Sequence, residues 1–268
     1  RVAKGDNSSN VVERAIEYWN GDEGKRGIVT LCWHWCPAAR YDKSKSDPWG
    51  TFYTDKTKFN LARAMNGSDP DGYQMLLDDI DAIAVQLKRL QDADVPVLWR
   101  PLHEASGGWF WWGASGADAY LQLYKLMYER LTNVHGLNNL IWVWNGQDAA
   151  WYPGDEYVDI IGEDIYPGKH VYTSQAARFI KALSYTDTRK LITLSENGCI
   201  PDPEQLVRDN IMWSYWCVWE GEFVLKAAGF NNYSEQYTEK NMLKKAYKSD
   251  TVITRKELPD LRNYPLGD

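Results

Sequence analysis

Strand-length apolar runs alternate with helical segments along most of the chain, and this alternation constrains the fold more than any other feature. The runs lie near residues 28–35, 96–102, 139–144, 158–162, 190–195 and 212–219. Between and around them, apolar residues spaced three or four positions apart predict helices over residues 9–19, 71–90, 117–134, 174–183 and 235–247. This order predicts an α/β fold, in which a parallel sheet is covered by helices.

Two of the apolar runs end in a glutamate. Val95–Gly113, with the sequence VPVLWRPLHEASGGWFWWG, carries Glu104, and LITLSENG carries Glu196. The carboxyl ends of parallel strands lie at the same edge of a sheet, so we expect both acids at one mouth. Sugar hydrolysis needs a carboxylic acid, a second carboxylate and flat rings that bind the apolar faces of pyranoses. The pattern therefore predicts a glycoside hydrolase.

The motifs RPLHE, GGWFWWG and LSENG together resemble glycoside hydrolase family 26, most of whose members are endo-β-1,4-mannanases. The resemblance runs from about Val11 to about Phe223, which is most of the chain. It implies a (β/α)8 TIM barrel with the acid/base at the end of strand 4 and the nucleophile at the end of strand 7. Glu104 then matches the acid/base and Glu196 the nucleophile of a retaining enzyme.

The number of strands differs from the number that the resemblance implies. If Glu104 follows strand 4, the run near residues 28–35 is strand 3, and strands 1 and 2 are expected upstream of Arg1. The length of 268 residues suits one domain of this type. We therefore expect residues 1–268 to form a single catalytic barrel domain that is incomplete at its N-terminus.

The resemblance also implies a set of substrate-binding residues. By their positions in the motifs these are His34, His103, Trp109 and Tyr166. Two further candidates follow from their places on strands: Trp219 closes the last apolar run, and Arg100 shares strand alternation with Glu104. Tyr166 matches a tyrosine whose hydroxyl holds the nucleophile, and Trp109 matches an aromatic platform beside the cleaved bond. His34 is alternatively a core histidine, and Arg100 fits a structural ion pair equally well.

Other strand-end residues have less certain roles. Asn145 and Asp164 are candidates for binding sugar hydroxyls, and Glu163 is expected behind the site or facing solvent. Strand alternation places Trp213 on the same face as Trp219. The loop before about Pro70 carries aromatic residues that could form a wall of the site, namely Trp49, Phe52, Tyr53 and Phe59.

Composition restricts the class of partner. A net charge of −7 argues against nucleic acid and anionic membranes, and no apolar run reaches the length of a membrane span. Fourteen tryptophans and seventeen tyrosines fit a carbohydrate groove or a tryptophan-rich core. The four cysteines form neither a disulfide framework nor a zinc spacing, so we expect no metal and no cofactor. We expect a secreted monomer that acts on a β-mannan-type polysaccharide or oligosaccharide.

Three alternative functions are open. The same fold and mechanism could serve β-1,3-1,4-glucan or xylan, because the motifs do not distinguish the sugar. The tryptophans alone would fit a non-catalytic carbohydrate-binding module. A metal-dependent hydrolase could use His34, His103 and a carboxylate, although its usual pair of closely spaced histidines on one strand is absent from this sequence.

Overall fold

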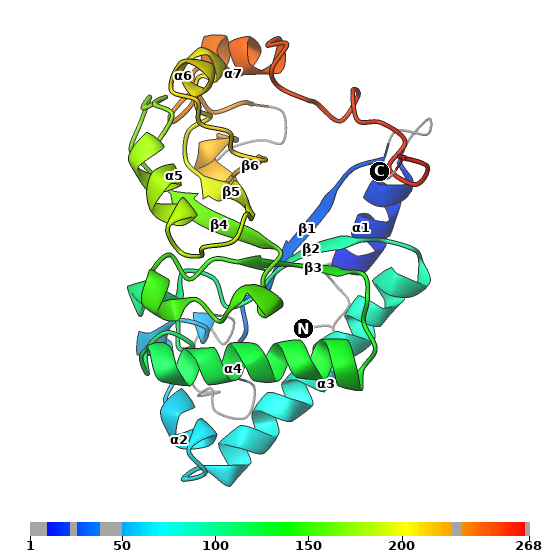
Figure 1. The fold of residues 1–268 in the computed structure, drawn as a ribbon, viewed down its shortest axis with the longest axis vertical. Helices are drawn as coiled ribbons and strands as arrows, with labels where there is room; N and C mark the ends of the chain where they lie inside the picture. The colour runs from blue at the N-terminus through cyan, green and yellow to red at the C-terminus, as the bar shows by residue number, and fades with distance from the viewer. Residues whose placement is uncertain (1–9, 22–25, 38–49, 227–231, 266–268) are drawn as a thin grey trace. The chain divides into compact units, whose positions relative to one another are not determined.

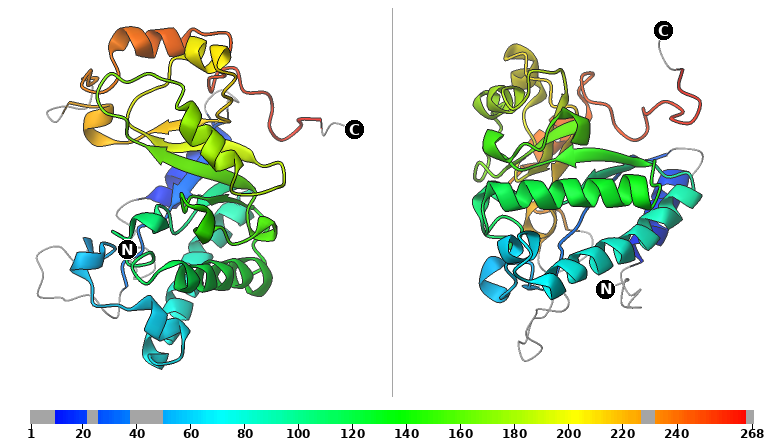
Figure 2. Two further views of the ribbon diagram at one scale, coloured as in Figure 1. Left: turned by 60° about the vertical axis from the view of Figure 1, so that its left-hand side comes forward. Right: turned by 60° about the horizontal axis from the view of Figure 1, so that its bottom comes forward.

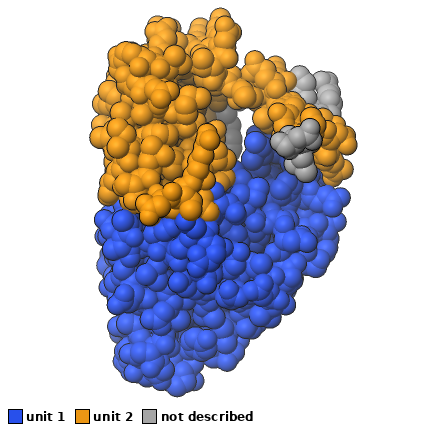
Figure 3. Space-filling model, in the orientation of Figure 1, with its two compact units in different colours: residues 1–159 blue, residues 160–268 orange. Residues whose placement is uncertain are grey.

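The computed structural model describes residues 10–21, 26–37, 50–226 and 232–265 (Figures 1 and 2). The chain forms two compact units, residues 1–159 and residues 160–268 (Figure 3). Trp49, one of the predicted aromatic wall residues, lies outside the described residues. Each unit contains a parallel sheet, and the two units are described in turn.

The first unit contains three parallel strands in the order β1, β2, β3. They span Val29–Cys32, Val97–Arg100 and Leu140–Trp144, and Val97 aligns with Val29 on one side and with Leu140 on the other. All four residues of β2 are buried, as expected for a parallel strand covered on both faces. Its helices are α1 (Val11–Asn20), α2 (Leu61–Met65), α3 (Pro70–Asp92) and α4 (Ala117–Glu129).

Helix α3 shows how the sequence fixes an element of this unit. Asp69 caps it by accepting a hydrogen bond from the Gly72 backbone N–H at 3.0 Å, and Pro70 occupies its first position, where no amide donor is needed. The apolar stripe that predicted this helix is buried, and it includes Met75, Leu76, Ile80, Leu87 and Leu90. Helices α3 and α4 cover one face of the sheet (Figures 1 and 2).

Short helical segments complete the first unit. Helix α4 continues into a π-helix over Arg130–Val134, so the predicted helical segment 117–134 is confirmed over its whole length. Single 3₁₀ turns lie at Thr54–Lys56, Ala105–Gly107, Ala149–Trp151 and Asp155–Tyr157.

The second unit repeats the pattern with strands β4 (Ile160–Ile165), β5 (Leu191–Asn197) and β6 (Trp216–Val218), which are parallel and in chain order. Its helices are α5 (Ala176–Leu183), α6 (Pro203–Arg208) and α7 (Lys240–Tyr247), with a 3₁₀ turn at Gly221–Phe223. The pairing of β4 with β5 shifts register between Glu163 and Asp164, so β4 is irregular at these two carboxylates.

Glu163 and Asp164 make different contacts. Glu163 has no exposed surface and accepts hydrogen bonds from Tyr185 Oη at 2.9 Å and Arg178 Nε at 2.9 Å, which joins β4 to α5. The expectation that Glu163 faces solvent is wrong, since its carboxylate is fully buried; its position behind the site stays a prediction. Asp164 is also buried and accepts a hydrogen bond from Ser195 Oγ at 2.6 Å.

Each predicted apolar run contains a strand, which confirms an α/β fold with parallel sheets. The last run is a strand only at Trp216–Val218, since the residues before it pack irregularly. Helices α2 and α6 were not predicted, because five or six residues are too few to show a period. The four cysteines, all within the described residues, form no disulfide, and no described helix has the length and apolar character needed to span a bilayer.

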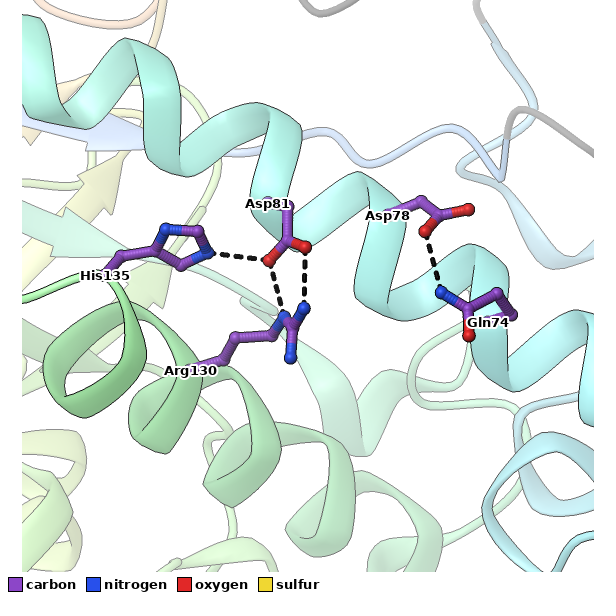
Figure 4. A network of polar contacts seen from close by, with 5 residues as sticks. All are labelled: Gln74, Asp78, Asp81, Arg130 and His135. Carbon is purple, nitrogen blue, oxygen red and sulfur yellow. Dashed lines mark hydrogen bonds and ion pairs between the residues drawn. The ribbon is translucent and has the colours of Figure 1, made fainter.

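An ion-pair network joins helix α3 to the π-helix Arg130–Val134 and to His135, which follows it (Figure 4). Asp81 of α3 accepts hydrogen bonds from Arg130 Nε at 2.5 Å and Nη2 at 2.6 Å, and its Oδ1 lies 2.6 Å from His135 Nε2. The Arg130 guanidinium, followed by His135, lowers the pKa of Asp81, although burial acts in the opposite direction. The ionised carboxylate therefore stabilises the folded state.

We expect Asp81→Asn to lower the free energy of unfolding at neutral pH by about 1 kcal/mol, because the network is partly exposed and screened. The folded-state pKa is depressed, so the deficit is fully present above the unfolded pKa of about 3.9 and disappears as pH falls through the folded value. Urea unfolding from neutral pH down to about pH 3 measures it. Asp78→Asn on the same helix, where Gln74 is the neutral partner, is the control. If the loss of unfolding free energy in Asp81→Asn does not change with pH, the ionised Asp81 carboxylate is not the source of this stability.

Candidate active site

Glu104 lies in a strained turn just after β2. Leu102 and Glu104 both have φ of 53°, in the left-handed region that residues other than glycine rarely adopt. The Glu104 backbone N–H donates to the carbonyl oxygen of Asn145, which follows β3, at 2.7 Å. Strained backbone of this kind persists when the surroundings fix it, and it gathers at functional sites.

Trp109 contacts Glu104 directly. Its Nε1–H donates to Glu104 Oε2 at 2.9 Å, and its side chain is 46% exposed. The Trp109 carbonyl oxygen accepts a hydrogen bond from the Thr54 backbone N–H at 2.8 Å, so the loop is also held from the neighbouring segment. Glu104 is thus a carboxylate beside an exposed aromatic ring.

His103 is buried next to Glu104 in sequence. Its ring lies 4.9 Å from the His34 ring and 4.9 Å from the Phe110 ring, and its carbonyl accepts a hydrogen bond from Trp112 Nε1 at 2.8 Å. Burial, and then the charges of Arg100 and His34, lower the pKa of His103 well below its usual value. The imidazole is therefore neutral at neutral pH. Its Nδ1 has no hydrogen-bond partner among the described residues.

His34 is half-buried and follows β1. It lies edge-on to His103 and to Phe52, whose ring centroid is 4.8 Å away. His34 therefore packs against the rings of His103 and Phe52 and is not a fully buried core histidine. Arg100 is 3% exposed and donates to Asn145 Oδ1 at 2.9 Å, which ties the ends of β2 and β3 together.

The residues predicted to form an aromatic wall make two kinds of contact. Phe52 packs beside His34, and Tyr53 packs against Phe110 with centroids 5.5 Å apart. Phe59 instead is buried, edge-on to Trp111 at 5.0 Å, and belongs to the core.

In the second unit, Glu196 and Tyr166 form the contact that the sequence implied. Glu196 lies near the end of β5, is 4% exposed, and accepts a hydrogen bond from Tyr166 Oη at 2.5 Å. Tyr166 follows β4 and is 42% exposed, so its ring also reaches solvent. A charge-assisted hydrogen bond of this kind fixes the orientation of a carboxylate.

Phe223 is a neighbour that sequence reasoning missed. Its ring lies 5.3 Å from that of Tyr166, in a 3₁₀ turn too short to produce any periodic signal. A Cβ atom at Gly198 would lie 3.2 Å from Phe223 and 3.3 Å from Tyr166, which is tighter than ordinary packing. Gly198, in the LSENG motif, thus leaves room for both rings.

The tryptophans around β6 differ from the prediction. Trp219 is half-buried, and its backbone N–H donates to the Asn197 carbonyl at 3.0 Å, beside the end of β5. Trp213 donates from Nε1 to the Ser174 carbonyl and packs edge-on against Phe179 of α5. The prediction that Trp213 shares the face of Trp219 relied on strand alternation, which does not extend to residue 213 because β6 begins only at Trp216.

The structure thus gathers the predicted residues into two sets. Within the first unit, Glu104 contacts Trp109, and His103 contacts His34 and lies near Arg100. Within the second unit, Tyr166 holds Glu196, and the backbone of Trp219 lies at the end of the same strand.

Comparison with known proteins identifies the family. The pattern of Glycosyl hydrolase family 26 matches residues 1–257. A mannan endo-1,4-beta-mannosidase of Thermothelomyces thermophilus is 43% identical over 259 residues, which are 96% of this chain and 51% of that protein. A mannan endo-1,4-beta-mannosidase A of Piromyces sp is 39% identical over 249 residues, covering 93% of this chain and 38% of that protein. This chain therefore spans about half or less of the length of these curated relatives.

Solved structures agree with the sequence relatives. The Podospora anserina GH26-CBM35 β-(1,4)-mannanase superposes with a TM-score of 0.83 at 39% identity, covering 95% of this chain and 54% of that one. A β-mannanase from a symbiotic protist of the termite Reticulitermes speratus, complexed with gluco-manno-oligosaccharide, gives 0.79 at 37% identity, covering 94% and 73%. By sequence and by structure, this chain belongs to glycosyl hydrolase family 26.

Proposed function

We propose that this chain is a retaining endo-β-1,4-mannanase that cleaves internal β-1,4-mannosidic bonds of mannan, glucomannan or galactomannan. Its catalytic pair is Glu104 as acid/base and Glu196 as nucleophile, within a single catalytic domain of the (β/α)8 barrel type. Family membership and the mannanase names of its relatives support the activity. The observation that carries the residue assignment is the hydrogen bond from Tyr166 to Glu196, since it orients the carboxylate at the end of β5.

In the first step of this mechanism, an ionised Glu196 oxygen attacks the anomeric carbon of the sugar. The bond from that carbon to the bridging oxygen breaks, and Glu104 gives its proton to the departing oxygen. The products are a shortened chain and a mannosyl ester of Glu196. The neutralised Glu196 no longer disfavours charge on a neighbouring carboxylate, which lets Glu104 act as a base in the next step.

In the second step, water attacks the anomeric carbon while Glu104 takes its proton. The ester bond to Glu196 breaks, and the released sugar has the same anomeric configuration as the substrate because two inversions have occurred.

The remaining residues bind the sugar in this proposal. Trp109 and Trp219 offer ring faces to pyranoses, and the exposed Tyr166 ring lies beside the nucleophile. The neutral His103 and its neighbour His34 supply hydrogen-bonding groups, and the buried His103 does not titrate near neutral pH because its pKa is lowered. Arg100 positions Asn145 at the ends of β2 and β3.

A polysaccharide-degrading enzyme must meet its polymer outside the cell, so we infer that the protein is secreted. We also infer that it acts as a monomer on mannan-type poly- and oligosaccharides, and not on nucleic acid or membranes. Its net charge of −7 is consistent with a neutral polymer as partner.

The test is release of reducing sugar from mannan, glucomannan, lichenan and xylan in parallel. Preferential hydrolysis of mannan and glucomannan is expected. Preference for lichenan or xylan would overturn the substrate while sparing the mechanism. Binding without any hydrolysis would indicate a binding module, and activity lost on exhaustive chelation would indicate a metal-dependent hydrolase.

Replacing Tyr166 by phenylalanine tests the orientation of the nucleophile. A hydrogen bond to a charged group contributes about 1.5–3 kcal/mol, so we expect kcat on mannan to fall by about 10- to 100-fold with KM little changed. Tyr237→Phe removes a hydroxyl of the same unit that bonds Glu222 at 3.1 Å, and it serves as the control. Equal activity of both variants would show that Tyr166 does not act on Glu196.

A further inference from the structure

Gly107 leaves the space that the Trp109 ring occupies. A Cβ atom at position 107 would lie 2.0 Å from Cζ3 and 2.1 Å from Cη2 of the Trp109 indole. Contacts below 3.0 Å do not occur with a real Cβ atom, so either the ring or the backbone must move when any side chain is added.

Backbone conformation does not explain this glycine. Gly107 closes the 3₁₀ turn Ala105–Gly107, and its φ is not positive, so alanine fits the backbone there. The next residue shows the opposite situation: Gly108 has φ of +71°, and a Cβ atom added there would meet no other atom within 4 Å. Gly107 therefore provides close approach, whereas Gly108 provides a left-handed turn.

The loop backbone is held from outside, so the ring is the part that can move. Thr54 donates from its backbone N–H to the Trp109 carbonyl at 2.8 Å and from Oγ1 to the Gly108 carbonyl at 2.9 Å. The Trp109 side chain is 46% exposed, and its ring can swing into solvent at a small packing cost. Such a movement breaks the hydrogen bond from Trp109 Nε1 to Glu104 Oε2.

We propose that Gly107 is a positioning residue: by its lack of a side chain it lets Trp109 fold back and hold the Glu104 carboxyl group in place for proton transfer to the leaving oxygen. The proposal rests on the proposed function, because it gives Glu104 the role of general acid. Stacking of the Trp109 ring on a sugar does not by itself require a glycine at position 107. The contact of Trp109 with Glu104 does, and this gives the first glycine of GGWFWWG its role.

The experiment compares two substrates with different need for an acid. We expect Gly107→Ala to lower kcat/KM on mannan about tenfold, since displaced catalytic groups cost this much or more. On an aryl β-mannobioside with a dinitrophenolate leaving group, which departs without a proton, the loss in kcat/KM is expected to be several-fold smaller than on mannan, because only the stacking of Trp109 on the sugar is affected. Equal losses on both substrates would overturn the positioning role.

A double-mutant cycle and a pH profile separate this role from simple destabilisation. In a Trp109→Ala background the ring is gone, so Gly107→Ala is expected to cause no further loss. In the Gly107→Ala variant the alkaline limb of the kcat/KM profile on mannan is expected to move to higher pH by about half a unit, because the carboxylate loses a donor. Gly108→Ala is the control: it strains the backbone without touching the ring, and it is expected to lower stability without moving that limb.

Fluorine NMR of protein labelled with 5-fluorotryptophan gives a readout that needs no activity. Of the fourteen tryptophan resonances, the one missing in Trp109→Phe belongs to Trp109. It is expected to shift in Gly107→Ala and to stay in Gly108→Ala. An unshifted resonance in an active enzyme overturns the proposal alone, whereas a shifted resonance in a protein that hydrolyses no β-glycan overturns the proposed function.

Discussion

In the Glu196→Gln variant, kcat on mannan is expected to fall by about 10⁴-fold or more, the size of loss that follows removal of a nucleophile. The amide keeps the shape of the side chain and can still accept the hydrogen bond from Tyr166, so the fold is retained. It cannot form the glycosyl ester through which the proposed mechanism proceeds. Initial rates with and without the substitution measure the effect.

Two further measurements make this prediction specific. Glu204→Gln alters an exposed glutamate of the same unit, which pairs with Lys245 at 2.8 Å, and its activity is expected to be unchanged. A mannobiosyl donor with fluorine at C2 and a reactive leaving group is expected to label the wild-type peptide that contains Glu196. Label on another carboxylate, or an active Glu196→Gln variant, would refute the assignment.

In the Glu104→Gln variant, kcat/KM on mannan is expected to fall by about 10²- to 10⁴-fold, the usual contribution of general acid–base catalysis. With a dinitrophenolate leaving group the first step needs no proton, so the ester of Glu196 forms at close to the normal rate and then accumulates. Rapid release of the phenolate followed by slow turnover is the expected kinetic pattern.

Azide distinguishes an acid/base residue from a merely structural one. As a nucleophile that needs no base, it is expected to restore turnover of Glu104→Gln on the activated substrate and to produce a β-mannosyl azide. Glu129→Gln, an exposed glutamate at the end of α4, is the matched control in the same unit. Failure of azide to restore turnover, with binding intact, would contradict the role given to Glu104.

Helices and strands could be predicted from the sequence where their buried residues form a regular pattern of apolar positions. The strand β2 is buried on both faces and therefore reads as a continuous apolar run, and α3 carries a stripe that its twenty-three residues repeat several times. The extent of β6 could not be predicted in this way. Trp213 is buried for another reason, as it packs on Phe179 of α5 outside the strand.

The parts of the site that lie in sequence motifs could be predicted, whereas the parts that depend on the conformation of a loop could not. The Tyr166–Glu196 contact joins the ends of adjacent strands, and the motifs EDIYPG and LSENG place both residues there. The left-handed conformation of Glu104 and the close approach of the Trp109 ring to Gly107 arise from a tight turn. Such a turn produces no repeating pattern of apolar residues in the sequence. The burial of Glu163 could not be predicted, because its partners Arg178 and Tyr185 come from α5 and the turn that follows it, and the strand-end motif does not encode them.

The central claim is that this chain cleaves β-mannosidic bonds by double displacement. Proton NMR of the first products formed from mannohexaose tests it most directly, because each newly released reducing end shows its anomeric configuration before mutarotation. The account predicts that the β-anomer forms first and that the α-anomer appears only later. Initial formation of the α-anomer would show a single displacement and would contradict the roles of Glu104 and Glu196.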